Sequence, residues 1–136
     1  MRKIVISTLL AIAMAQGADV CSHPTIMKQV ADPKEMMSCS NNVITETYLR
    51  DKINDEAKMK QFKEKFEKWL FNTYCYAPFG QEIMTSPNNG TYHVKVVDDK
   101  HNNELLFDFT VNKQTCKKWD DFKKEQKRLK EQNMWK

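Results

Sequence analysis

Glycine is scarce in this chain, with three among 136 residues. A loop that cradles a phosphate needs several neighbouring glycines, because backbone N–H groups must approach the anion closely. The three glycines, Gly17, Gly80 and Gly90, are too dispersed to build such a loop. We therefore expect no nucleotide-dependent enzyme and no cofactor.

Long apolar runs are also missing after the first residues, so no transmembrane segment is expected in the mature protein. The chain instead begins with two basic residues, an apolar run over Ile4–Ala13 and the small-residue pattern Ala13-Met14-Ala15. This order is typical of a secretory signal peptide, and the run is too short to span a bilayer. We predict a leader over residues 1–15, with cleavage as late as residue 18 as the alternative. The protein is then exported, to the periplasm or the extracellular space, and the sequence does not separate bacterial from eukaryotic secretion.

Four cysteines, Cys21, Cys39, Cys75 and Cys116, follow the predicted leader. In a small exported domain this number is typical of two disulfides, for which three pairings exist. We favour Cys21–Cys39, which closes a segment without clear periodicity, and Cys75–Cys116, which ties the end of a long helix to the junction before the last one. Free thiols or pairing with another chain are the alternatives.

Positive charge is concentrated at the C-terminus. The chain has 22 basic and 18 acidic residues, and residues 117–136 alone contain eight basic and four acidic ones. A local excess of this kind indicates either a solvated helix or a contact with a specific partner. Because the acids dilute the field, we do not expect nucleic acid as a partner; an anionic membrane surface is an alternative to a protein.

The pattern of apolar residues predicts a single α+β domain over residues 43–136, preceded by a loop-rich arm over 16–42. A helical period runs through residues 43–74, with a kink or break near Asn54, which we expect to cap the second part. We expect this long N-terminal helix to pack on a three-stranded antiparallel meander. The basic C-terminal helix, roughly 118–132 within the tail 117–136, follows the sheet.

The three strands of that meander are expected near residues 81–85, 91–96 and 105–111. A period of two in the last two ranges, and the turn residues before and between them, indicate a hairpin. The pairing that we expect places Val94 opposite Phe107 and His93 opposite Asp108.

Two clusters could have chemical functions. His23, Met27, Met36 and Met37 lie near Cys21 in the sequence, and thioether and imidazole ligands suit Cu(I). The other interpretation is that these methionines fill gaps under a disulfide-closed loop. A pair formed by His93 and Asp108 could be part of a hydrolytic triad, although no serine or cysteine nucleophile has a recognisable setting nearby.

The favoured function is a non-catalytic exported protein that binds another macromolecule, such as an envelope or secretion accessory factor or an inhibitor of a secreted enzyme. The alternatives are a small disulfide-bonded secreted hydrolase and a periplasmic copper-binding protein. The expected binding surface combines the outer sheet face with the basic tail: His93, Lys95, Leu106, Asp108, Lys123, Lys124, Lys127, Arg128 and Trp135.

Overall fold

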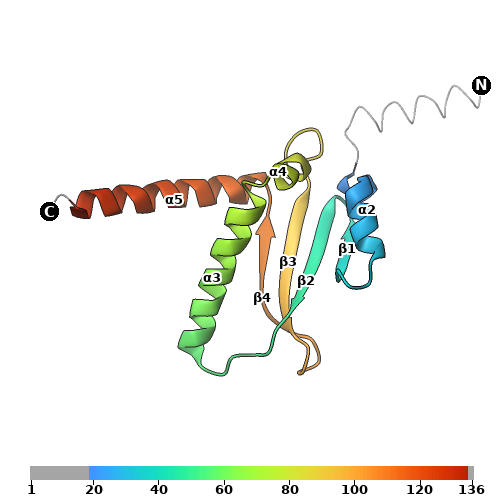
Figure 1. Cartoon of the computed structure of the whole chain (residues 1–136), viewed down its shortest axis with the longest axis horizontal. Coiled ribbons are helices and arrows are strands. Elements are labelled where there is room, and N and C mark those ends of the chain that lie inside the picture. The colour runs from blue at the N-terminus through green and yellow to red at the C-terminus, as the bar shows by residue number, and fades with distance from the viewer. Residues whose placement is uncertain (1–18, 135–136) are drawn as a thin grey trace, which may run out of the picture.

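The computed structural model describes residues 19–134, which form a four-stranded sheet with helices packed on it (Figure 1). The predicted leader and its cleavage points lie outside the described residues. Among the helices that the structure does describe, none is both long and apolar enough to cross a membrane. In chain order the elements are η1 (Val20–Ser22), α2 (Pro24–Ala31), β1 (Met37–Ser40), β2 (Val43–Leu49), α3 (Glu56–Tyr74), α4 (Pro78–Met84), β3 (Thr91–Asp98), β4 (Glu104–Val111) and α5 (Lys113–Met134).

The sheet is mixed, with the strand order β1-β2-β3-β4. The outer pairs β1–β2 and β3–β4 are antiparallel, whereas the central pair β2–β3 is parallel. A parallel neighbour needs a long crossover, and α3 and α4 provide it between β2 and β3. The predicted three-stranded antiparallel meander behind a long N-terminal helix is therefore wrong.

The predicted sheet lacks β1 and β2, because the residues of the turn between these strands are also typical of an irregular loop. Asn41 and Asn42 both have positive φ, 51° and 64°, and join β1 to β2 as a two-residue hairpin loop of the kind that asparagine favours. The Asn42 side chain also accepts a hydrogen bond from the Val20 amide at 2.8 Å. The segment expected to be a loop-rich arm thus contributes η1, α2 and β1 to the fold.

Residues 43–49, expected to be the start of a helix, form β2. Val43, Ile44 and Thr45 are β-branched and favour strands, but Glu46 interrupts the apolar alternation that would have indicated one. The following helix α3 begins at Glu56, and its N-cap is Asp55 rather than Asn54.

The remaining boundaries also differ from the prediction. Residues 81–85 do not form a strand, because Pro78 begins the short helix α4, which buries Ile83 and Met84. The longest helix is α5, with 22 residues, and Asn112 begins it by accepting a hydrogen bond from the Thr115 amide at 3.0 Å. The β3–β4 register places Val94 opposite Phe109 instead of Phe107.

One face of the sheet packs against the helices and forms the core. Ile44, Val94 and Val111 point to this face and are completely buried. They form one cluster with residues from η1, α2, α3 and α4: Val20, Ile26, Leu70, Phe71, Cys75, Ile83 and Met84. The long helix α5 contributes no fully buried residue, and Figure 1 shows it running away from the sheet.

Candidate functional site

The outer sheet face carries the histidine and carboxylate that the sequence pairs. His93 Nε2 lies 2.8 Å from Asp108 Oδ2, although the strand register places Lys95 opposite Asp108 and Thr110 opposite His93. The contact is therefore diagonal, and the predicted direct pairing is wrong by two residues. The two side chains are 30% and 47% exposed, as in an ordinary cross-strand pair on a wet sheet face.

Leu106 is not the exposed apolar residue of this face. The β3–β4 ladder is irregular between Val96 and Val97, which pair with Phe107 and Leu105. Leu106 is left between them and is partly buried, while Leu105 is 50% exposed.

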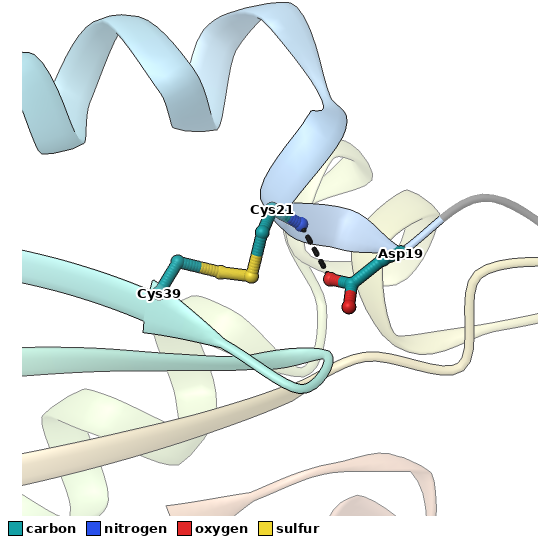
Figure 2. Close-up of side chains that lie close together, drawn as sticks. All are labelled: Asp19, Cys21 and Cys39. Atoms are coloured by element: carbon teal, nitrogen blue, oxygen red, sulfur yellow. Dashed lines mark hydrogen bonds between the residues drawn. A yellow bond between two sulfur atoms is a disulfide. The ribbon is translucent and has the colours of Figure 1, made fainter.

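The expectation of two disulfides is confirmed: Cys21 is joined to Cys39 and Cys75 to Cys116, the pairs that spacing favoured. Figure 2 shows the first bridge, with the Asp19 carboxylate accepting a hydrogen bond from the Cys21 amide at 2.9 Å. These three side chains lie close enough together to suggest a metal site. Both sulfurs are consumed by the bridge, so no thiolate ligand is left.

The four residues considered as copper ligands, His23, Met27, Met36 and Met37, lie in separate surroundings. His23 caps α2, because its Nδ1 accepts a hydrogen bond from the Thr25 amide at 3.2 Å. Its Nε2 lies 3.4 Å from Glu82 Oε1. Met27 on α2 is 57% exposed, and Met36, which precedes β1, is 42% exposed, while Met37 is partly buried against the core. The copper hypothesis stays a prediction without support from these contacts.

The basic helix α5 forms a groove with α3, which we call the lysine groove. It encloses about 370 Å³. Four of its lining residues are basic and two are aromatic, and none is acidic: Lys68, Asn72, Trp119, Phe122, Lys123, Gln126, Lys127 and Lys130.

The lysine groove has a firm base and an open apolar surface. Trp119 stacks on Phe71 of α3, with ring centroids 5.4 Å apart. Its indole Nε1 donates a hydrogen bond to Asn72 at 3.0 Å, and Lys123 Nζ donates to the same oxygen at 3.2 Å. Phe122 is 51% exposed, so the groove presents apolar surface beside its positive charges.

Some basic residues of the predicted tail already pair with acidic residues of the same helix. Lys124 pairs with Asp120 at 3.0 Å, and Arg128 makes two hydrogen bonds to Glu125, at 2.6 and 3.1 Å. Lys123 and Lys127 line the groove instead. Trp135 lies outside the described residues.

Sequence reasoning missed a buried carboxyl group that lies beside Tyr74 of α3. Glu46 of β2 faces the helices and is only 8% exposed. Its Oε2 accepts hydrogen bonds from the hydroxyl of Tyr74 at 2.5 Å and from that of Tyr48 at 3.2 Å. Burial is the largest influence on the pKa of Glu46, and this pKa lies above its ordinary value although the two hydrogen bonds act to lower it.

The tyrosines around Glu46 remain hydrogen-bond donors at neutral pH. Burial, reinforced by the nearby carboxyl group, raises the pKa of Tyr74 and of Tyr92 above the ordinary value of 10.0. Glu46 lines two adjoining hollows, of about 180 and 420 Å³. We call these two hollows together the Glu46 cleft.

A strand assignment for residues 43–49 would have indicated that Glu46 points toward the core. With Ile44 directed to the core, the period of two places Glu46 and Tyr48 on the same face. Burial of an acidic side chain destabilises the folded state unless the side chain has hydrogen-bond partners. An acid at an inward position of a strand therefore indicates a candidate functional site.

Comparisons of the chain with protein-family models, with curated proteins and with solved structures find no match. The residues themselves therefore carry the functional argument.

Proposed function

We propose that this protein is exported and non-catalytic, and that it binds another protein through the lysine groove. The leader-like beginning of the sequence and the two disulfides are compatible with export. The groove supports binding because its side chains are recognition groups: lysines that attract anions, and aromatic rings that provide an apolar anchor.

The observation that carries the proposal is the set of four lysines in a groove whose described lining contains no acidic residue. Lys123, Lys127 and Lys130 follow one another at four and three residues, a spacing that places them on one face of α5. Lys68 lines the groove from α3, and within residues 19–134 no acidic residue lines the same space. The complementary partner is an acidic segment that also inserts an apolar side chain beside Phe122.

A photo-crosslinking amino acid at position 122 in the otherwise native chain tests this proposal in the native exported compartment. The crosslinked protein is identified, purified and titrated against wild type and against Lys123→Glu/Lys127→Glu/Lys130→Glu. The matched control reverses three exposed lysines of α3, Lys58, Lys60 and Lys63, and therefore changes the net charge equally.

We expect the groove variant to bind the partner at least about tenfold more weakly, since three ion pairs of up to about 1 kcal/mol each are replaced by repulsion between like charges. The α3 control should bind like wild type. Equal weakening in both variants would show that only net charge matters and would overturn the proposal. Lysine-dependent binding to phosphatidylglycerol vesicles or to a single-stranded oligonucleotide, without a protein crosslink, would overturn it in favour of those partners.

A further inference from the structure

The Glu46 cleft is built by five elements around one carboxyl group. Its smaller hollow, of about 180 Å³, is lined by Gln29 of α2, Glu46 of β2, Tyr74 of α3 and Tyr92 of β3, together with Phe79 of α4. Gln29, Glu46 and Tyr74 also line the larger hollow. Residues that are distant in sequence thus converge on Glu46 as the common wall of both spaces.

Two polar atoms on residues that line the smaller hollow have unused hydrogen-bonding capacity. The hydroxyls of Tyr48 and Tyr74 both donate to Oε2 of Glu46. Within residues 19–134, no group donates a hydrogen bond to Oε1. The hydroxyl of Tyr92 likewise makes no hydrogen bond within these residues, although Tyr92 is only 3% exposed. No fully enclosed side-chain nitrogen or oxygen of the described residues lacks a partner. These two atoms therefore border open space, and the hollow is the space that their side chains line.

The carboxyl group also lacks a counterion. Among the described residues, none of the ion pairs within 4.0 Å involves Glu46. Lys34 lines the larger hollow, but so does Glu35, whose charge acts in the same direction as burial on the pKa of Glu46. A buried carboxylate is stabilised most by a cation that can also donate hydrogen bonds.

The size and lining of the smaller hollow select the type of cation. About 180 Å³ is below the range of drug-sized ligand pockets and suits a group of side-chain size. The rings of Tyr74, Tyr92 and Phe79 offer faces and edges to an aliphatic chain and to a positive charge. A guanidinium group pairs best with both oxygens of a carboxylate, and here Oε2 is already occupied by two tyrosines. An ammonium group needs only the one remaining oxygen.

We propose that the smaller hollow of the Glu46 cleft binds a primary alkylammonium group, which donates hydrogen bonds to Glu46 Oε1 and to the Tyr92 hydroxyl. The group is supplied either by a free alkylamine or by a lysine side chain of another protein. This site is separate from the lysine groove, so each proposal can fail without the other.

NMR titration of the isotope-labelled, oxidised protein tests the site. The ligands are n-butylammonium, Nα-acetyl-lysine amide and tetramethylammonium, the last of which has charge but no N–H donor. We expect n-butylammonium to shift the signals of Phe79 and Tyr92, and tetramethylammonium to bind at least about tenfold more weakly, because it loses a charge-assisted hydrogen bond. Binding of the lysine amide as well assigns the site to a side chain, and binding of n-butylammonium alone assigns it to free amines.

Three variants complete the test. Glu46→Gln preserves shape and should weaken n-butylammonium at least about tenfold, because the charge is lost. Tyr92→Phe should weaken it less. The matched control Glu64→Gln changes an exposed acid of α3 and should bind like wild type. Absence of shifts at saturating n-butylammonium, or unchanged affinity in a folded Glu46→Gln protein, would overturn the proposal.

Discussion

Loss of the Cys75–Cys116 disulfide should destabilise the protein more than loss of the Cys21–Cys39 disulfide. The first pair is separated by 41 residues and the second by 18. Because the entropy that a crosslink removes from the unfolded chain rises with the logarithm of the loop length, the expected contributions are about 4 and about 3 kcal/mol. Cys75 follows the last turn of α3 and Cys116 lies in the first turn of α5, so this bridge also anchors the projecting helix.

Guanidinium unfolding of Cys75→Ala/Cys116→Ala and of Cys21→Ala/Cys39→Ala measures both effects. Tryptophan fluorescence reports the transition, and each free energy of unfolding is extrapolated with the variant's own slope against denaturant concentration, because removing a crosslink expands the unfolded chain. Hydrogen exchange should also accelerate in the first turns of α5 in the first variant only. A smaller loss of stability for the Cys75–Cys116 pair than for the other pair, or a loss below about 1 kcal/mol for either, would refute the loop-length argument.

Three further predictions concern the surroundings of the Glu46 cleft and the β3–β4 turn. Gly80→Ala should cost about 3 kcal/mol, because a Cβ at this position overlaps the Tyr74 carbonyl oxygen; an unchanged urea midpoint would contradict this close approach. Glu46→Gln should raise the free energy of unfolding at neutral pH. Burial raises the pKa of Glu46 in the folded state, so the wild type loses stability as the pH rises from the ordinary pKa of 4.5 through the folded-state pKa. Parallel stability–pH curves for the two proteins would disprove that sign. For Asp98, burial raises the pKa, but hydrogen bonds, the strongest from His101 at 2.6 Å, lower it below 3.8. The stability that the ionised Asp98 contributes is lost as the pH falls through its folded-state pKa. Urea titrations at several pH values should show this loss in the wild type and not in Asp98→Asn. An identical loss in the variant would rule the explanation out.

Some elements could be read directly from local patterns. The alternation around Val94 and Phe107 predicted the β3–β4 hairpin, because strand partners that are close in sequence share one turn. The helical period within residues 43–74 predicted the body of α3, since a helix closes its hydrogen bonds within four residues.

The register and the sheet order could not be read in this way. Two pairings of β3 with β4 that differ by two residues keep the same side chains on the same face, so the apolar pattern alone does not separate them. The parallel partner of β2 lies beyond two helices, and nothing in residues 43–49 specifies it locally. The Glu46 cleft could not be predicted for the same reason, because its lining residues are far apart in the sequence and come from α2, β2, α3, α4 and β3.

The amino-acid sequence by itself determined the features that depend on near neighbours or on composition: the two disulfides, the β3–β4 hairpin, the helical periods and the basic character of the C-terminal helix. Only the tertiary structure decided the mixed strand order, the convergence of Tyr48 and Tyr74 on Glu46 and the grouping of four exposed lysines beside Phe122 in one groove. The physical reason is that local periodicity reports hydrogen bonds and faces within one element. Contacts between elements depend instead on which faces pack together, a choice made by the whole core at once.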